Sequence, residues 1–387
     1  MKEISDLFVI NPSINVSPYC YSVFRVEPYQ TCEHKCVYCF GRWYRTANED
    51  KNEPMLKTLR AFRKIIKILK KRQLRTIPFR LSTLVDPFQP IEEQYKVSRH
   101  IMNLSLKYDV PLIINTKAIL LTKDDYFTIL RKLSDREIVI VQISLSVLND
   151  KIAKILEPRA PLPYERIDMA EFLSREGIPV IIRLQPFIPG ITDHELKSII
   201  ELSRYAGVKQ IIVEALRDEY ENIKFYGELA YNKQLYRRLE AWSSYSPSVE
   251  VQSKILRPNV DWRTNTFALA GKICNKYGLE FSTCKEGFYE LNTAKNCCGM
   301  HFINESKYVL RPTLWEAWNY YKKHNKIPKF EELTENLAGN YVFGDVLKYY
   351  PRILRKKMMG HEKILRQILD ERRKELSVLL PSIFKAD

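Results

Sequence analysis

The chain has 387 residues, of which 45% are hydrophobic and 28% are charged, and its formal net charge is +16 at pH 7. This composition is typical of a globular protein with one large domain and an extension, or with two ordinary domains, and no stretch reaches the ~20 apolar residues that a membrane-spanning helix needs. The first residues lack the apolar core of a secretory signal, so we expect a cytosolic protein without a membrane partner.

The charge and the cysteines each suggest a class of partner. A large excess of Lys and Arg suggests an anionic partner, and nucleic acid is the commonest one because each phosphate can be neutralised. A surface rich in Lys, Arg and Glu is also typical of heat-adapted proteins. The eight cysteines are clustered along the chain, which indicates metal ligands in a reducing compartment and not a disulfide framework.

Short β-rich segments alternate with amphipathic helical segments from about residue 22 to residue 215, the pattern of repeated βα units around a parallel sheet. Beyond residue 216 the pattern is less regular, with helical stretches expected near residues 232–242 and 264–277 and a Tyr- and Lys-rich helical tail. Six strands are predicted, at residues 22–26, 77–82, 111–116, 138–145, 178–184 and 210–215, and helices are predicted at residues 56–71, 92–108, 123–133, 164–176 and 193–206.

The first predicted strand is followed by three thiols at C-x3-C-x2-C spacing, Cys32, Cys36 and Cys39. Thiolates are the ligands of iron–sulfur clusters. Three protein ligands on a four-iron cluster leave one iron open, as a catalytic metal site does for its substrate or cofactor. The alternative is half of a structural zinc site, which would need a fourth ligand from elsewhere in the chain.

This spacing, with the aromatic Tyr38 directly before the last cysteine, resembles the signature of the radical S-adenosylmethionine superfamily. The resemblance implies a 4Fe-4S cluster on the three cysteines, with the methionine part of S-adenosylmethionine on the unique iron. It also implies that an electron, from a reductant such as ferredoxin or flavodoxin, cleaves this cofactor and releases a 5′-deoxyadenosyl radical. The superfamily has a partial (β/α)6 barrel, with which the six predicted units agree, and chemistry in such barrels gathers at the C-terminal ends of the strands.

The loop after the second predicted strand holds Asp86 and Gln89 between two prolines that restrict the backbone. Their side-chain oxygens could accept hydrogen bonds from the ammonium of an amino-acid cofactor, or Asp86 could instead cap the next helix or turn. Together with the cysteines, this loop resembles the branch of the superfamily that contains spore photoproduct lyase.

Later strand ends extend this resemblance over about residues 20–217. Lys117 follows the third predicted strand, where the lyase family has a Lys that meets the cofactor carboxylate, and it could act there as a point charge. Ser144, at the end of the fourth, is a candidate hydroxyl contact to the cofactor. Segment 177–190 resembles the family's fifth strand and the loop that flanks adenine. The predicted cofactor-binding residues are Tyr38, Asp86, Gln89, Lys117, Ser144 and Gln185.

The resemblance fails at one position. Spore photoproduct lyase has a cysteine near the end of the second strand that returns a hydrogen atom to the product radical, and Thr83 lies at or near that place. Because an O–H bond is too strong to replace a thiol as hydrogen donor, repair of the thymine photoproduct is not expected. No catalytic hydrogen donor is identified.

A second group of potential ligands lies near residue 300. Cys284, Cys297, Cys298 and His301 could bind a second metal, as an auxiliary iron–sulfur cluster or as zinc. Adjacent cysteines seldom both reach one metal ion, which leaves the ligand set open. The cysteines could instead be small buried hydrophobes, or one thiol could supply the missing hydrogen atom.

The sequence as a whole predicts an α/β fold: a partial (β/α)6 radical S-adenosylmethionine barrel at residues 22–217 with a mainly helical, cysteine-containing C-terminal extension. An N-terminal segment (1–21) would precede it, and an extension with the second cysteine cluster (218–310) and a helical tail (311–387) would follow. The favoured function is hydrogen abstraction from nucleic acid. Two alternatives are a peptide- or small-molecule-modifying radical enzyme with an auxiliary cluster, and a non-catalytic zinc-dependent nucleic-acid-binding protein. The oligomeric state is left open.

Overall fold

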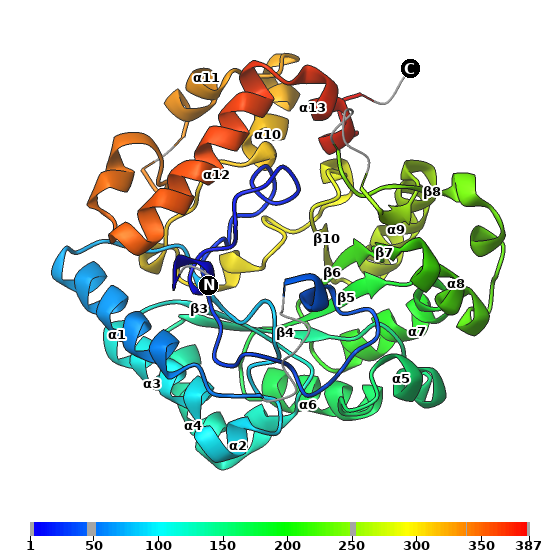
Figure 1. Ribbon diagram of the computed structural model, residues 1–387, viewed down its shortest axis with the longest axis horizontal. Helices are drawn as coiled ribbons and strands as arrows, with labels where there is room; N and C mark the ends of the chain where they lie inside the picture. Colours follow the sequence, from blue (N-terminus) through cyan, green and yellow to red (C-terminus); the bar gives the residue numbers. More distant parts are fainter. Residues whose placement is uncertain (1–3, 45–51, 248–252, 338, 385–387) are drawn as a thin grey trace.

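The computed structural model describes residues 4–44, 52–247, 253–337 and 339–384, so the ends of the predicted N-terminal segment and of the helical tail lie outside the described residues, as do residues 248–252 of the extension. A parallel sheet of seven strands forms its centre, in the order β1-β2-β3-β4-β5-β6-β10 (Figure 1). The strands are β1 (Arg25–Val26), β2 (Phe79–Leu81), β3 (Leu112–Thr116), β4 (Val139–Ser144), β5 (Val180–Phe187), β6 (Gln210–Ala215) and β10 (Glu280–Thr283).

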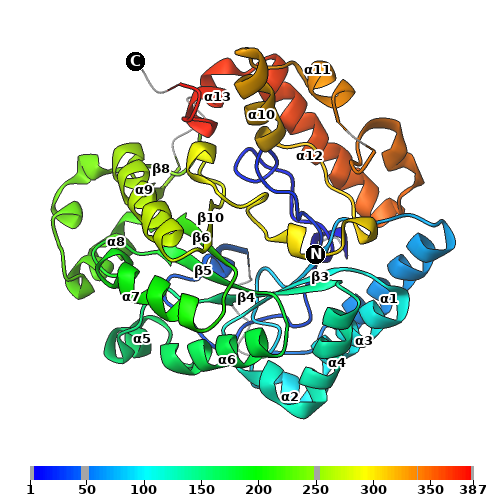
Figure 2. The same cartoon turned by 180° about the vertical axis from the view of Figure 1, so that it is seen from behind.

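Helices cover the outer face of this sheet (Figures 1 and 2). Strands β3 to β6 are runs of Ile, Val and Leu that are buried on both faces, as parallel strands between two covering layers are. Helix α1 buries Phe62, Ile66 and Leu69 on one side and exposes its Lys and Arg residues on the other. The outer helices are α1 (Leu56–Lys71), α3 (Val97–Tyr108), α4 (Asp124–Asp135), α6 (Pro163–Arg175), α7 (Thr192–Tyr205) and α9 (Val260–Lys276).

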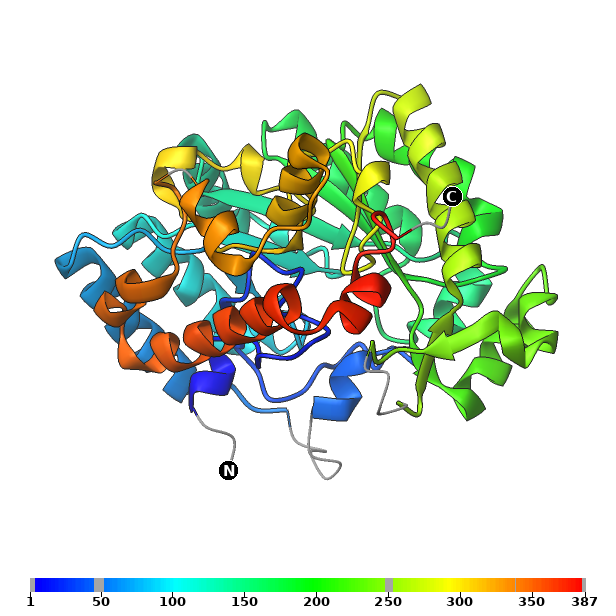
Figure 3. The same cartoon turned by 90° about the horizontal axis from the view of Figure 1, so that it is seen from above.

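The N-terminal segment and the C-terminal helices close the other side of the sheet. The segment runs between α12 and the sheet (Figures 1 and 2), and Figure 3 shows the orange and red helices in front of the strands. The Ser17 hydroxyl donates to Nδ1 of His361 at 2.8 Å, and Arg311 donates to the Ser17 carbonyl at 2.7 Å. The helices of this region are α10 (Leu314–His324), α11 (Phe330–Glu335), α12 (Arg352–Asp370) and α13 (Arg373–Leu379).

These features confirm the predicted α/β fold and the helical C-terminal region, with two differences in detail. The sheet has a seventh strand, because β10 from the predicted extension pairs with β6 in parallel. The helix expected at residues 92–108 is two helices, α2 (Glu92–Tyr95) and α3, separated by Lys96 at φ +52°. The division of the chain after residue 217 stays a prediction.

The prediction of a helix near residues 232–242 is wrong. This segment forms two short 3-10 turns, Leu235–Arg237 and Leu239–Ala241, and then enters a three-stranded antiparallel sheet, β7 (Asp218–Glu219), β9 (Ile255–Pro258) and β8 (Trp242–Ser244). Trp242 is buried and donates its indole N–H to the Leu235 carbonyl at 3.1 Å. Tertiary burial of aromatic side chains therefore outweighs the local helical pattern. The remaining helices are α5 (Asp150–Leu156) and α8 (Tyr220–Leu229).

Within the described part of the chain, none of the helices is both long enough and apolar enough to cross a bilayer.

Candidate functional site

The cysteine loop follows β1 and lies over the C-terminal ends of the strands. Burial raises the pKa of Cys32 to about 11 and raises that of Cys36 further, so both are neutral thiols in this structure. In the described ranges, no three His, Cys, Asp or Glu side chains meet in a group that could hold a metal ion. Protonated cysteine side chains are not drawn to a common point. They are expected to gather around a metal only when it binds them as thiolates and displaces their protons.

The donor chemistry of the loop fits an iron–sulfur cluster. Its three candidate ligands are all thiols, and the backbone N–H of Asp86 points at the Cys32 sulfur at 3.4 Å. Backbone donors to the ligand sulfur atoms are among the contacts that tune such clusters. The loop is also tied down, since Val37 N–H donates to the Leu156 carbonyl at 2.8 Å.

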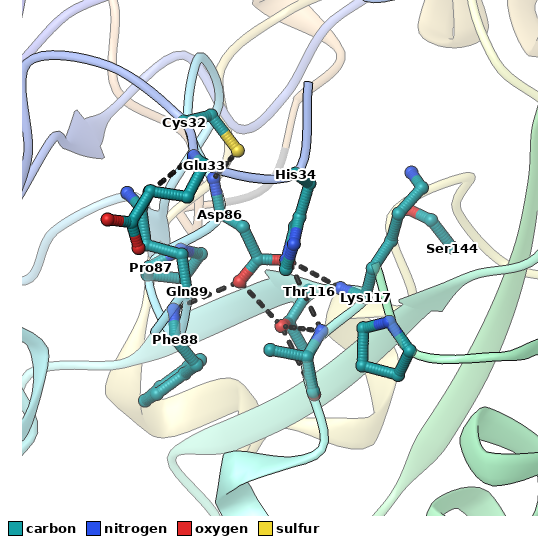
Figure 4. A network of polar contacts seen from close by, with 12 residues as sticks. Cys32, Glu33, His34, Asp86, Pro87, Phe88, Gln89, Thr116, Lys117 and Ser144 are labelled. Atoms are coloured by element: carbon teal, nitrogen blue, oxygen red, sulfur yellow. Dashed lines mark hydrogen bonds and ion pairs between the residues drawn. The ribbon is translucent and has the colours of Figure 1, made fainter. Parts of the chain in front are cut away.

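Asp86 anchors this loop to the ends of two strands (Figure 4). Its carboxylate accepts from the Thr116 hydroxyl at 2.8 Å and from the backbone N–H groups of Lys117 and Phe88 at 2.6 and 2.9 Å. Nε2 of His34 lies 3.2 Å from the same carboxylate. Burial raises the pKa of Asp86, but the charge and hydrogen bond of His34 and these N–H donors lower it to about 2. The geometry gives Asp86 a loop-anchoring role, and its contact with a cofactor stays a prediction.

Gln89 joins the two loops directly. Its side-chain oxygen accepts from Glu33 N–H at 2.7 Å and from Asn52 at 3.0 Å, and its NH2 group donates to the Thr31 carbonyl at 2.9 Å. The side chain is fully buried. It thus holds the cysteine loop in place, and its predicted contact with a cofactor is likewise not established.

A buried ion pair fixes Tyr38. The Tyr38 hydroxyl donates to Glu157, and Glu157 pairs with Arg166, with side chains that are 0% and 1% exposed. Arg166 also donates to the carbonyls of Pro161 and Ser144, at 2.9 and 3.1 Å. This Tyr38–Glu157–Arg166 network connects the cysteine loop to α6 and to the end of β4.

Two of the predicted cofactor contacts lie beside this network. The Lys117 ammonium lies 5.5 Å from the centre of the Tyr38 ring, and its positive charge partly offsets the effect of burial on the Cys36 pKa. Ser144 ends β4 and is half-buried. Thr116 and Ile143 are partners in the pairing of β3 with β4, so Lys117 and Ser144 follow at neighbouring strand ends (Figure 4). The structure therefore brings Lys117 and Ser144 to the same face as the cysteine loop.

Gln185 belongs to a polar chain across β5 and β6. Its side-chain oxygen accepts from Arg183 and its NH2 group donates to Glu214. Glu214 in turn pairs with Lys285 at 2.7 Å and with Arg217 at 3.3 Å. The predicted role of Gln185 beside adenine is not tested by these contacts.

Thr83 is held by charged neighbours. Its hydroxyl donates to Glu27 at 2.6 Å and accepts from Arg25 at 2.9 Å. Its backbone N–H also donates to Glu27, at 2.9 Å. Thr83 lies where the lyase family has a hydrogen-donating cysteine. Here it forms part of a polar contact between the end of β1 and the loop after β2.

Cations outnumber anions at the ends of β6 and β10, a feature that sequence reasoning missed. Arg217 lies 4.9 Å from the ring centre of Phe40, the residue after Cys39, so this group adjoins the cysteine loop. It was missed because β10 was not predicted, although Arg217 closely follows the predicted sixth strand. Among the described residues, Glu214 pairs with Arg217 and Lys285, and Glu286 pairs with Arg257 and Arg263, so each of these two buried carboxylates is shared by two cations.

Three of the four predicted ligands of a second metal lie together. The sulfur atoms of Cys297 and Cys298 are 3.7 Å apart, and Cys284 interacts with Cys297. His301 is not with them, because its Nε2 pairs with Glu280 at 2.6 Å. Cys20 takes its place beside Cys298, a contact that no local spacing in the sequence could indicate.

Comparison with known proteins bears on this arrangement. A family model described as the radical SAM superfamily matches residues 26–203. A protein of Acidianus two-tailed virus is 30% identical over 158 residues, which are 40% of this chain and 50% of the viral protein. The radical SAM Nalpha-GlyT isomerase of Pseudomonas phage M6 is 24% identical over 214 residues, 53% of this chain and 42% of that protein.

A solved structure is similar in fold. Spore photoproduct lyase with a dinucleoside spore photoproduct superposes with a TM-score of 0.50 at 10% identity, covering 68% of this chain and 77% of that one. The chain spans about half the length of the first curated relatives it matches, 50% and 54%. A radical SAM domain implies S-adenosylmethionine and a 4Fe-4S cluster as its cofactors.

Proposed function

We propose that this chain is a radical SAM enzyme that uses a 4Fe-4S cluster and S-adenosylmethionine to abstract hydrogen from an anionic substrate, with nucleic acid favoured. The observation that carries the proposal is the three-thiol loop at the strand ends, inside the matched residues 26–203. When bound, the cluster would supply the electron that cleaves S-adenosylmethionine and releases a 5′-deoxyadenosyl radical.

The residues around the loop would divide the work of binding. Cys32, Cys36 and Cys39 would hold the cluster as thiolates, and the Asp86 and Gln89 contacts would keep the loop in place for them. Lys117 would bind the cofactor carboxylate, since its ammonium lies beside the ring of Tyr38 next to the last cysteine. An acidic reductant such as ferredoxin or flavodoxin would supply the electron, in a reducing, cytosolic compartment.

The preference for an anionic substrate rests on the cations beside the loop. Arg217 and Lys285 share one carboxylate, Glu214, and Arg217 also lies 4.7 Å from the ring centre of Tyr245. Their side chains are mostly buried, 13% and 14% exposed, so an excess positive charge there is poorly screened and favours an anion. A phosphate beside an aromatic ring would satisfy both features, as in the binding of single-stranded nucleic acid.

Anaerobic reconstitution with iron and sulfide, followed by reduction with S-adenosylmethionine present, tests the chemistry. We expect 5′-deoxyadenosine from the wild type and none when Cys32, Cys36 and Cys39 are all replaced by Ala. Product from this triple variant would refute the cluster assignment. One zinc per chain and no 5′-deoxyadenosine in the wild type would favour a non-catalytic zinc-dependent nucleic-acid-binding protein instead.

The salt dependence of binding tests the substrate class. We expect a short single-stranded oligonucleotide to bind less tightly as salt rises, and Arg217→Gln or Lys285→Gln to reduce the slope of log affinity against log salt by about 0.7 each, as loss of one phosphate contact does. Lys67→Gln on the exposed face of α1 is the matched control, since it removes one positive charge far from β10 (Figure 1), and it should leave the slope unchanged.

A peptide- or small-molecule-modifying enzyme with an auxiliary cluster is the second candidate, and the group of buried thiols near residue 298 favours it. Failure to bind the oligonucleotide at any salt concentration would select this candidate. Equal loss of slope in the Lys67→Gln variant would show that the basic outer helix binds nucleic acid, and would contradict the assigned site.

A further inference from the structure

Four thiols meet inside the barrel although they come from separate parts of the chain. Cys20 belongs to the N-terminal segment, and Cys284 follows β10. Cys297 and Cys298 lie in the turn before Gly299, with their sulfur atoms 3.7 Å apart. Side-chain interactions join Cys298 to Cys20 and Cys297 to Cys284. The four thiols are therefore linked in the order Cys20, Cys298, Cys297, Cys284.

Two buried guanidinium groups face these sulfur atoms. Nη2 of Arg80 lies 2.9 Å from the Cys298 sulfur, and Nη2 of Arg183 lies 3.9 Å from the Cys284 sulfur. Arg80 is 6% exposed and Arg183 is 7% exposed. Both donate to the neutral amide of Gln142, and in the part of the chain that the structure describes neither forms an ion pair with a carboxylate. Arg183 interacts with the charge of Glu214 across Gln185, and Arg80 lies directly against the Cys298 sulfur, so two buried cations flank the thiols and favour a negatively charged group there.

We propose that Cys20, Cys284, Cys297 and Cys298 bind a second iron–sulfur cluster of the 4Fe-4S type. Such a cluster binds all four cysteines as thiolates, so each one that is still protonated loses its proton when the cluster binds. The oxidised cluster with four thiolate ligands has a net charge of about −2, which the guanidinium charges of Arg80 and Arg183 would balance. This site goes beyond the proposed function and is compatible with either substrate class, because hydrogen abstraction needs only the cluster on the first cysteine loop.

The geometry favours a polynuclear cluster over a single zinc ion. Among the described residues, no three His, Cys, Asp or Glu side chains are arranged to hold a metal ion, here or at the first cysteine loop, so these thiols would have to move toward any bound metal. Cys297 and Cys298 are adjacent in sequence, which makes it difficult for both to reach one metal, whereas each can bind a different iron of a cluster. His301 does not compete as a ligand, since it pairs with Glu280.

The surroundings suit a buried cluster. Gly299 has φ +71°, and a Cβ there would lie 2.1 Å from Cδ1 of Ile181, so the turn that carries two of the thiols presses directly on the sheet. Apolar surroundings limit the access of water and help to set the potential of such a cluster. The side chains that pack around Cys284 and Cys298 include Ile113, Ile140, Ile181, Ile212 and Met300.

The iron and acid-labile sulfide content of anaerobically reconstituted full-length variants tests the proposal. We expect about eight irons in the wild type and about four in a Cys20→Ala/Cys298→Ala variant, as one four-iron cluster each implies. Cys274→Ala is the matched control, because Cys274 is a buried thiol on α9 outside this group of four thiols, and it should keep the wild-type iron content.

The outcomes separate this proposal from the proposed function. The Cys32, Cys36 and Cys39 triple Ala variant should keep about four irons and an iron–sulfur absorption spectrum, and would thus report the second cluster alone. About four irons in the wild type, with no loss in Cys20→Ala/Cys298→Ala, would refute the second cluster. Loss of one zinc in that variant would refute it equally. Retention of the remaining four irons shows that the variant has folded.

Discussion

Replacing Arg166 by Met tests the buried ion pair behind Tyr38. The side chains of Arg166 and Glu157 are 1% and 0% exposed, and Glu157 also accepts the Tyr38 hydroxyl. Met occupies a similar length without charge, so the variant leaves Glu157 buried without its cation. Because removal of one partner of a buried pair costs ~3–5 kcal/mol, we expect the free energy of unfolding to fall by about that amount.

The loss should depend on pH in a defined direction. Burial raises the pKa of Glu157, but the charges of Arg166 and Lys117 outweigh it and lower that pKa in the wild type. This contribution to wild-type stability is present above the unfolded pKa of ~4.3 and is lost as the pH falls through the folded pKa. Without Arg166, burial dominates and the folded pKa should rise above the unfolded one, so protonation would relieve the variant's destabilisation as the pH falls from 7 toward 5.

Urea denaturation followed by far-UV circular dichroism, in metal-free reducing buffer, measures these free energies. Lys123→Met is the matched control, since it breaks a pair with Glu93 whose side chains are 59% and 57% exposed, and such pairs contribute ~0–1 kcal/mol. Replacing Glu157 and Arg166 together by Met should recover most of the loss. A cost of Arg166→Met no greater than that of Lys123→Met, or a double variant as unstable as the single one, would contradict a stabilising role of the buried ion pair.

Three further predictions concern other parts of the chain. Burial lowers the pKa of His361 to about 3. The contribution of neutral His361 to the free energy of unfolding is therefore present above pH ~6.5 and is lost at ~1.4 kcal/mol per pH unit as the pH falls from there toward 3. His361→Gln should flatten this slope in pH-dependent thermal unfolding. Gly299→Ala should lower the free energy of unfolding by ~2–4 kcal/mol, because the new Cβ clashes with the sheet and the residue is strained at a positive φ. Gly177→Ala, which also has a positive φ but open space around it, should lower it by ~1 kcal/mol. Equal losses in the two variants would contradict the clash. Lys117→Gln should weaken S-adenosylmethionine binding to the reconstituted protein by about tenfold or more, since a charge-assisted contact contributes ~1.5–3 kcal/mol; unchanged affinity in equilibrium dialysis would exclude the predicted contact.

The local sequence pattern is sufficient to predict a strand or helix when the element's own residues show a clear apolar pattern. Residues 210–215 were predicted as a strand and form β6, and the predicted helix at residues 56–71 is α1, because each has a long periodic or continuous apolar pattern. Strand β10 was missed since its four residues, Glu280–Thr283, are too few to show a period, and its pairing partner β6 lies far away in sequence.

Some features of the candidate site can likewise be predicted from the sequence, and others cannot. The three-cysteine motif and the order of strand-end residues could be recognised because their meaning lies in spacing along the chain. The buried pair of Arg166 with Glu157 and the excess of cations around Glu214 could not, because burial decides how strongly charges interact and only packing decides burial.

The sequence by itself determined the α/β fold, its helical C-terminal region and the loop of three thiols, since periodicity and close spacing are local properties. Only the tertiary structure decided that Cys20 joins Cys298 while His301 pairs with Glu280, and that Arg80 and Arg183 face the thiols. Residues hundreds of positions apart become neighbours when the N-terminal segment and the turn at Gly299 pack together on the inner side of the sheet, and no local pattern contains that information.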